Sequence, residues 1–311
     1  MNKLEQLREM TVVVADTGDI EAIRKYRPQD CTTNPSLILK AVGLAGYKQY
    51  LEDARKSAAS GGVEAAMDTL TVKIGTELAH LVPGNVSTEV DARLSYDTPA
   101  LIEKARTLIG LYEQEGVGKD RILIKLATTW EGVEAARVLQ REGIRCNMTL
   151  VFSMAQAIAS AQAGAYLISP FVGRITDWYK KARGVESFAV EDDPGVQSVK
   201  GIYAHFQQYA YDTIVMGASF RSKEQVEALA GCDRLTISPQ LLGELEADQG
   251  TLTRQLSPNR GSDQAEPLTQ AEFRWQVSDD AMATDKLAEG IRQFHQDSEK
   301  LRHMLQEVVS A

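Results

Sequence analysis

The stretch RILIKLATTWEGVEAARVLQREGIRCNMTLV, residues 121–151, contains the unit on which the predicted fold depends. Two short apolar runs, 122–125 and 146–151, enclose a segment in which apolar residues recur three and four positions apart between Val133 and Leu139. The first run leads directly into the helical segment. An apolar strand followed by a helix and another apolar strand is typical of a parallel sheet that is covered on both faces.

The same unit recurs along the whole chain, with helical segments between short apolar runs. Eight strands of this kind predict a closed (β/α)8 barrel formed by residues 1–311 as a single domain. An open, doubly wound sheet is the alternative, although no GxGxxG turn follows the first strand and no GxxxxGK[ST] motif occurs. The eight predicted strands are 12–15, 31–33, 86–90, 122–125, 146–151, 165–169, 213–216 and 234–237.

Four segments lie outside the simple repeat. We expect a short N-terminal helix at about 2–10, two helices within 47–81, and an irregular surface crossing at 249–270, which is polar and contains two prolines. A long C-terminal helix at about 282–309 has an apolar stripe, which favours packing over the barrel wall; pairing with a second subunit is the alternative. Predicted helix N-caps are Thr98-Pro99, Thr128-x-x-Glu131, Ser153-x-x-Gln156 and Ser238-Pro239.

Composition excludes several classes of protein. The 311 residues are 43% hydrophobic and 25% charged, enough for a packed core, which excludes intrinsic disorder and a small disulfide scaffold. The net charge of −9 repels phosphate backbones and anionic lipid, so we expect no nucleic-acid partner.

The expected compartment is the cytoplasm. The start of the chain has no apolar region typical of a signal peptide, and no stretch is apolar and long enough to span a bilayer, so we expect no membrane partner. The three cysteines are far apart and form no CxxC pair, which fits buried thiols in a reducing environment.

Polar residues follow most of the predicted strands, at the end of a barrel where active sites form. Lys125 is the central one, because it lies in an apolar strand where its charged form is poorly solvated, and a neutral amine can attack a carbonyl to form a Schiff base. A lysine that reaches water or pairs with a carboxylate is the alternative. In chain order the strand-end residues are Asp16, Thr33, Asn34, Glu89, Lys125, Asn147, Thr149, Ser169, Ser219, Arg221, Thr236 and Ser238.

Two carboxylates and two arginines add to this chemistry. Glu89 and Asp16 could transfer the protons that Schiff-base chemistry requires, or could serve as salt-bridge acids. Arg174 and Arg221 follow the sixth and seventh strands, where such barrels often bind phosphate; a surface salt bridge is the alternative for each. The four histidines lie in predicted helices and no HExxH motif occurs, so we expect no metal and no Ser-His-Asp triad.

Several long motifs resemble the transaldolases, in the order found in that family, from about residue 10 to the end of the chain. The two signature segments are DCTTNPSLI at 30–38 and ILIKLATTWEG at 122–132. The others are VVADTGD at 13–19, STEVDARLSYD at 87–97, CNMT at 146–149, ISPFVGR at 168–174 and GASFR at 217–221.

This resemblance implies a cofactor-free (β/α)8 barrel that moves a dihydroxyacetone unit from a ketose phosphate to an aldose phosphate, in a family whose members are often homodimers. It implies that Lys125 forms the Schiff base, that Asp16 takes the proton from the donor C4 hydroxyl, and that Glu89 acts through a water with the help of Thr149. The signature DCTTNPSLI includes Thr33, which we expect at the substrate. The resemblance places Asn34, Asn147 and Ser169 at the dihydroxyacetone unit, Phe171 in the pocket wall, and Arg174, Ser219 and Arg221 at the phosphate.

Two other functions remain open on the sequence. A simple aldolase, such as a fructose 6-phosphate aldolase, would use the same barrel and lysine, but those relatives are shorter and typically have Gln and Tyr in place of Glu89 and Phe171. A barrel that binds sugar phosphates without turnover is the second, and the intact Lys125, Asp16 and Glu89 argue against it.

Overall fold

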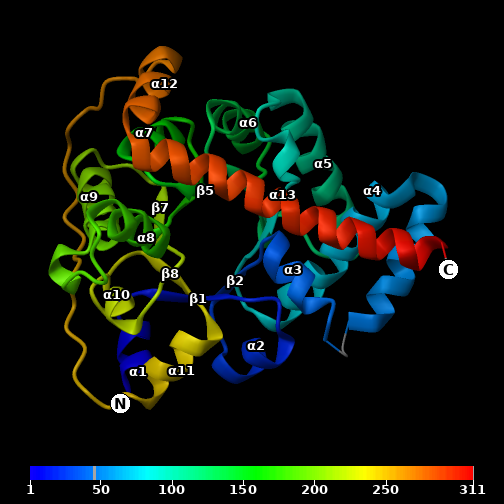
Figure 1. Cartoon of the computed structure of the whole chain (residues 1–311), viewed down its shortest axis with the longest axis horizontal. Helices are drawn as coiled ribbons and strands as arrows, with labels where there is room; N and C mark the ends of the chain where they lie inside the picture. Colours follow the sequence, from blue (N-terminus) through cyan, green and yellow to red (C-terminus); the bar gives the residue numbers. More distant parts are fainter. Residues whose placement is uncertain (45–46, 311) are drawn as a thin grey trace.

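The computed structural model describes residues 1–44 and 47–310, which form a closed barrel of eight parallel strands in the order of the sequence (Figure 1). Each strand lies within two residues of its predicted bounds, so the predicted (β/α)8 barrel is confirmed and an open sheet is excluded. The strands are β1 Val12–Asp16, β2 Asp30–Thr32, β3 Val86–Glu89, β4 Ile122–Ala127, β5 Cys146–Val151, β6 Leu167–Pro170, β7 Ile214–Gly217 and β8 Arg234–Ile237.

The barrel closes where β1 pairs with both β2 and β8, with Val12 opposite Arg234. Helices surround it (Figure 1). Those in the described residues are α1 Lys3–Arg8, α2 Ile20–Tyr26, α3 Pro35–Ala41, α4 Lys48–Leu81, α5 Thr98–Gln114, α6 Trp130–Arg141, α7 Met154–Gln162, α8 Val172–Arg183, α9 Pro194–Gln208, α10 Lys223–Glu227, α11 Pro239–Ala247, α12 Gln270–Asp279 and α13 Ala281–Ser310, with short 3-10 helices at Ala92–Leu94, Lys119–Arg121 and Val190–Asp192.

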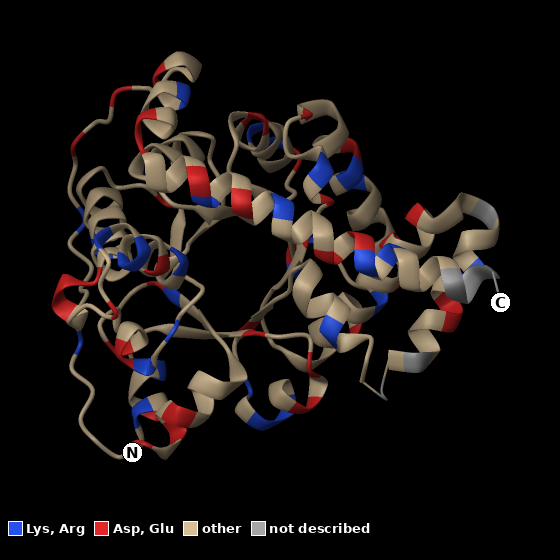
Figure 2. Ribbon diagram, in the orientation of Figure 1, with Lys and Arg blue, Asp and Glu red and all other residues tan. Residues whose placement is uncertain are grey.

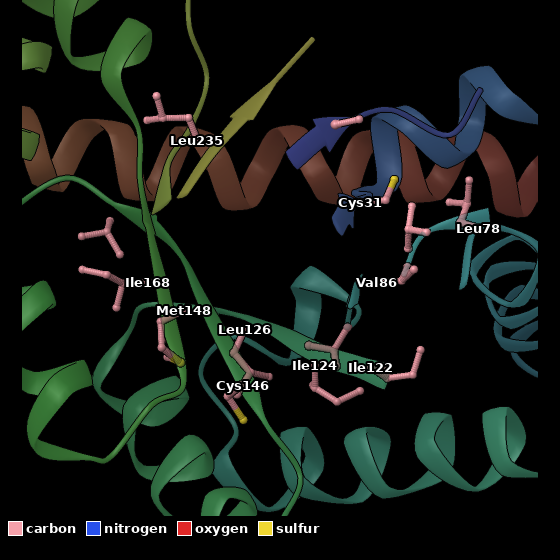
Figure 3. Close-up of a cluster of buried hydrophobic side chains, with 14 of the residues drawn as sticks. Cys31, Leu78, Val86, Ile122, Ile124, Leu126, Cys146, Met148, Ile168 and Leu235 are labelled. Atoms are coloured by element: carbon pink, nitrogen blue, oxygen red, sulfur yellow. The ribbon is translucent and has the colours of Figure 1, made fainter. Parts of the chain in front are cut away.

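The strands are apolar because both of their faces are buried. Ile122, Ile124 and Leu126 of β4 belong to the core between the barrel and its covering helices (Figure 3). Leu123 belongs instead to a separate cluster with Val14, Leu167 and Met216. Alternate residues of a strand point to opposite faces, so Leu123 and Lys125 face the barrel interior together.

Two of the four predicted helix caps are confirmed and two are wrong. Ser153 and Ser238 cap α7 and α11 as expected. Helix α5 is capped by Asp97, which leaves Thr98 in the first turn, and α6 is capped by Thr129. The Thr128 hydroxyl instead donates a hydrogen bond to the Thr149 carbonyl at 2.7 Å, so it joins β4 to β5.

The segments outside the repeat have the predicted form. The long helix α4 is interrupted at Gly62, where φ is 69°, so residues 47–81 contain the two predicted helical pieces. Residues 249–269 contain no helix or strand.

The expected location of the C-terminal helix needs correction. Helix α13 contacts α3, α4 and α8, and its residues Leu287 and Phe294 cluster with Phe152 and Phe171, which follow the C-terminal ends of β5 and β6. The helix therefore crosses the mouth of the barrel rather than its wall (Figure 1). Helical periodicity indicates that a stripe is buried, but it does not indicate which surface buries it.

The opposite, N-terminal end of the barrel is closed by polar side chains. Arg234 of β8 forms an ion pair with Asp30 of β2, both largely buried, and donates a hydrogen bond to the Tyr166 hydroxyl at 3.1 Å. Since the active sites of such barrels form at the other end, we expect this polar cluster to serve the stability of the barrel.

The charged residues and the cysteines are distributed as the sequence predicts. Acidic and basic residues are interspersed along the outer helices (Figure 2). Cys31, Cys146 and Cys232 are buried and free, as predicted, and burial raises the pKa of all three thiols. Within the described ranges, no helix has the length and apolar character needed to cross a bilayer.

Candidate active site

A cavity of about 310 Å³ opens at the C-terminal ends of the strands, beneath α13. Its wall includes most of the predicted site residues. They are Asp16, Asn34, Lys125, Ser169, Phe171, Arg174, Ser219 and Arg221. Glu89 and Thr33 line a small adjoining cavity of about 50 Å³, which shares Asn34 with the large one.

Lys125 receives its polar contacts from Glu89 of β3 and from Thr33, which follows β2. Its partners in register are Glu89 of β3 and Asn147 of β5. The Lys125 Nζ atom is 3.0 Å from Glu89 Oε2, with both side chains 5% exposed, and it donates a hydrogen bond to the Thr33 carbonyl at 3.3 Å. The amine is therefore buried, held in one orientation and in direct contact with a carboxyl group.

Glu89 and Asp16 are both buried carboxyls with raised pKa values. Burial is the largest cause in each case, and the positive charge of Lys125 opposes it. Asp16 also accepts a hydrogen bond from the Thr32 hydroxyl at 2.8 Å. A carboxyl group whose pKa is raised toward neutrality can act as an acid in one step and as a base in the next.

A chain of hydrogen bonds orients the amide beside Lys125. The Ser169 hydroxyl donates to Asn147 Oδ1 at 2.7 Å, and Asn147 Nδ2 donates to the Ser87 hydroxyl at 3.1 Å. All three side chains are buried. Ser87 was missed by the sequence analysis because it lies within a strand rather than at its end.

Thr149 of β5 is buried, and among the described residues its hydroxyl has no hydrogen-bond partner. The next residue, Leu150, has a φ of 56°, and the β5–β6 register shifts between Met148 and Val151. Non-glycine residues in this region of φ cost about 1–3 kcal/mol and gather at functional sites. The unpaired hydroxyl and the strained backbone both mark this strand end as part of the site.

Arg174 has a largely buried guanidinium that lies beside two aromatic rings. It lies in the first turn of α8, and its guanidinium carbon is 5.0 Å from the Phe171 ring centroid and 5.4 Å from that of Phe294. Burial lowers the Arg174 pKa. No carboxylate of the described residues forms an ion pair with it, so its donors can bind a phosphate group.

Arg221 differs from Arg174 because it already has a carboxylate partner. Its Nη2 atom is 2.8 Å from Asp177 Oδ2, with both side chains more than 40% exposed. It also donates to the Ser219 hydroxyl at 3.4 Å, and Ser219 has a φ of 60°. Both arginines line the same cavity, and Gly173 packs against the Ser219 loop; a Cβ there would lie 2.4 Å from the Ser219 carbonyl oxygen.

The sequence analysis gave no role to several residues that line the cavity: Thr32, Ser36, Lys40, Phe220 and Phe294. Thr236 lines it too, and its hydroxyl is 2.6 Å from that of Thr32. Thr32 precedes the predicted strand end, and Phe294 lies on the last helix, for which the sequence predicts only an apolar stripe. The sequence alone could not place these two residues in the site. Thr32 faces the cavity because of the register of β2, and Phe294 does so because of the path of α13, and both are fixed only in the assembled barrel.

Among the described residues, no group of three or more His, Cys, Asp or Glu side chains is placed to bind a metal ion. The site combines a buried amine, two carboxyl groups, hydroxyl and amide groups, and the Arg174 guanidinium, which lines the same cavity as Lys125.

A family profile and highly similar relatives of the chain point to the same protein family. A family profile described as "Transaldolase/Fructose-6-phosphate aldolase" matches residues 13–305. The chain is 56% identical to "Transaldolase" of Alteromonas mediterranea over 100% of this chain and 99% of the relative. It is 56% identical to "Transaldolase A" of Salmonella typhimurium (98% and 99%), and 54% identical to "Transaldolase" of Marinobacter nauticus (100% and 99%).

Proposed function

The chain belongs to the transaldolase/fructose-6-phosphate aldolase family, and from this membership we propose that it is a transaldolase. The enzyme takes a dihydroxyacetone unit from sedoheptulose 7-phosphate or fructose 6-phosphate and transfers it to erythrose 4-phosphate or glyceraldehyde 3-phosphate, in the non-oxidative pentose phosphate pathway. The observation that supports this most is the buried Lys125 amine, 3.0 Å from Glu89 and in the same cavity as the unpaired Arg174.

Imine formation uses Lys125 and Glu89. The deprotonated amine attacks the ketose carbonyl to form a carbinolamine, and protonated Glu89 then gives a proton, relayed through a water, to the departing hydroxyl. A water leaves, a protonated imine forms at Lys125 Nζ, and Glu89 is left as a carboxylate. The raised pKa of Glu89 supports this role, because the group must hold a proton before it can give one. Thr149, with its unpaired hydroxyl, positions the water through which Glu89 acts.

Carbon–carbon cleavage uses Asp16. Its carboxylate takes the proton of the C4 hydroxyl, the C3–C4 bond breaks, and the electron pair moves into the protonated imine to give an enamine. The aldose phosphate leaves with the new carbonyl group. Positive charge from Lys125 and Arg174 keeps Asp16 more acidic than burial alone would allow, which supports its service as a base.

The remaining site residues bind substrate. Thr33, Asn34, Asn147 and Ser169 contact the dihydroxyacetone unit, and Phe171 forms the pocket wall. Arg174, Ser219 and Arg221 bind the phosphate, where a bidentate guanidinium suits its geometry. Transfer is completed when an acceptor aldehyde enters the same phosphate site and the enamine attacks it.

A borohydride experiment tests the proposal. With fructose 6-phosphate, reduction should fix a three-carbon adduct on Lys125, and Lys125→Ala should lose nearly all turnover. Lys40 is the internal control, because it is also a cavity lysine. An adduct on Lys40, or none on any lysine, contradicts the Schiff-base mechanism.

A coupled assay separates the transaldolase from the simple aldolase. Glyceraldehyde 3-phosphate should form from fructose 6-phosphate when erythrose 4-phosphate is present, and much more slowly without it. Equal formation in both reactions would indicate an aldolase.

We also propose a cytoplasmic location and a homodimer, as in many members of the family. Sedimentation of the purified protein tests the dimer.

A further inference from the structure

Helix α13 is not part of the barrel repeat, yet it places an aromatic ring inside the site. Phe294 is 2% exposed and lines the large cavity. Its ring centroid is 5.8 Å from Lys125 Nζ and 5.4 Å from the Arg174 guanidinium carbon. The ring therefore lies near the Lys125 amine on one side and near the Arg174 guanidinium, the proposed phosphate-binding group, on the other.

Contacts on both sides of Phe294 fix its position. One turn before it, Gly290 packs so closely that a Cβ would lie 2.6 Å from Leu150 and 3.2 Å from Arg174. Just after it, the Asp297 carboxylate accepts a hydrogen bond from Ser36 of α3. The helix is thus held on both sides of Phe294, by packing at Gly290 and by the hydrogen bond at Asp297, and this fixes where the ring lies.

Arg302 attaches the next part of the helix to the barrel. Its side chain is 8% exposed, and it contacts Glu64 of α4 at 3.0 Å and Asp91 after β3 at 3.3 Å. Asp91 is two residues beyond Glu89. The helix that contains Phe294 is thus tied to the same strand end as the carboxyl group that contacts Lys125.

The enamine intermediate of the proposed reaction must be protected from water. If a proton from water reaches the enamine carbon, the imine re-forms on a dihydroxyacetone unit, and a second water hydrolyses it to free dihydroxyacetone and the Lys125 amine. Transfer is then lost, and the net reaction is the cleavage of an aldolase. A polar wall would hold water near the imine, whereas an apolar ring excludes it.

We propose that Phe294 is a specificity-determining residue, which excludes water from the Lys125 imine and so favours transfer to an aldehyde over hydrolysis. This proposal rests on the proposed transaldolase function. The other described contacts of the Lys125 amine, with Glu89 and the Thr33 carbonyl, are polar. Water exclusion on this side of the amine is therefore assigned to the α13 ring.

The test compares Phe294→Leu and Phe294→Ala with Ile291→Ala. Ile291 is a matched control because it lies one turn earlier on α13 and packs against the same apolar cluster, but is not part of the cavity wall. For each protein, glyceraldehyde 3-phosphate release from fructose 6-phosphate is measured with and without erythrose 4-phosphate. In D2O, the deuterium content of released dihydroxyacetone counts the enamine protonations directly.

The acceptor-free rate, divided by the acceptor-dependent rate, should rise roughly tenfold in Phe294→Ala, which corresponds to about 1.4 kcal/mol of relative barrier. It should rise less in Phe294→Leu, and stay at the wild-type value in Ile291→Ala even if thermal stability falls. An unchanged ratio in folded Phe294→Leu overturns the inference, and so does an equal rise in Ile291→Ala. If Phe294→Ala does not fold, the leucine variant decides.

Failure of the inference is distinguishable from failure of the proposed function. A wild-type protein that forms glyceraldehyde 3-phosphate equally with and without acceptor contradicts the function itself. A wild-type protein that depends on acceptor, together with Phe294 variants that depend on it equally, contradicts the role of the ring and leaves the function intact.

Discussion

Asp16 and Glu89 are both buried carboxyl groups, but they differ in what they touch. Glu89 contacts the Lys125 amine directly at 3.0 Å, whereas Asp16 is hydrogen bonded to Thr32 and lines the large cavity from the end of β1. The group that contacts the amine suits imine formation, and the group that faces the large cavity suits removal of a hydroxyl proton. Their positions at strand ends were predictable from the sequence, while this difference in contacts required the register of the barrel.

Asp16→Ala should separate imine formation from cleavage, because Lys125 can still attack the carbonyl when no carboxylate remains to take the C4 hydroxyl proton. With fructose 6-phosphate and borohydride, mass mapping should find the six-carbon sugar on Lys125, where wild type gives mainly the three-carbon fragment. Glu89→Ala is the comparison and should slow adduct formation itself, by about 10²- to 10⁴-fold. Trapping of the three-carbon fragment at the wild-type rate in Asp16→Ala would exclude Asp16 as the base.

Asp16→Asn should make the fold more stable at neutral pH. Burial raises the Asp16 pKa above its ordinary 3.8, so the folded state binds this proton more tightly than the unfolded state. Stability from this group is therefore highest at low pH and is lost as pH rises from about 4 through the raised pKa, by about 1.4 kcal/mol for each pKa unit. Denaturant melts of both proteins between pH 4 and 8 should show a difference that grows with pH; a constant difference contradicts the prediction.

The two arginines should differ in their effect on phosphorylated donors. Arg174→Ala should reduce kcat/KM for fructose 6-phosphate by about tenfold to a hundredfold, since a charged hydrogen bond is worth about 1.5–3 kcal/mol, with little effect on free dihydroxyacetone as donor. Arg221→Ala should cost less, because Asp177 already shares its charge. Asp177→Asn is the matched control and should lower KM. Equal losses on phosphorylated and unphosphorylated donors would make both arginines structural.

Among the elements, the strands could be predicted closely and the last helix could not. The predicted run 146–151 coincides with β5, because both faces of this strand are buried and only Asn147 and Thr149 interrupt its apolar residues. The α6 cap was predicted one residue early because Glu131 lies three residues after Thr128, as in a capping box; in the structure Thr128 donates to the Thr149 carbonyl and Thr129 caps the helix. The place of α13 depends on Gly290 and Arg302, whose partners lie far away in the chain.

Arg302→Met should loosen α13 while leaving the barrel folded. The substitution removes the buried guanidinium that pairs with Glu64 and Asp91, but Arg93 still pairs with both carboxylates, so the cost should be about 1.5 kcal/mol. Hydrogen exchange should accelerate in α13 around Phe294 and stay slow in the strands. Lys300→Met is the control, because Lys300 is 63% exposed and its pair with Asp297 is worth about 0–1 kcal/mol. Unchanged exchange in α13 would contradict the anchoring role of Arg302.

Across the whole molecule, the two ends of the barrel have separate tasks. The C-terminal end contains the cavity, Lys125 and both carboxyl groups, while the N-terminal end contains the Arg234–Asp30 pair and Tyr166. Stability and activity should therefore respond to different substitutions.

Arg234→Met should lower the free energy of unfolding by about 3–5 kcal/mol, because it leaves Asp30 buried without its partner. At 25 °C kcat should stay within about twofold of wild type, since the substitution lies at the end remote from the cavity. Arg260→Met is the control: its pair with Asp212 is exposed, and urea melts should shift little. A large fall in kcat of folded Arg234→Met would show that the two ends are coupled.

The closure of the sheet between β1 and β8 also bears on how the molecule acquires its activity. Residues 12 and 234 must meet before either strand has both neighbours, and contacts between such distant parts of a chain form slowly. Asp16 stands on β1, so an unclosed sheet has a fixed Lys125 but a misplaced cleavage base. During refolding, secondary structure should therefore recover before turnover does, and the delay between the two measures the time that the first and last strands take to find each other.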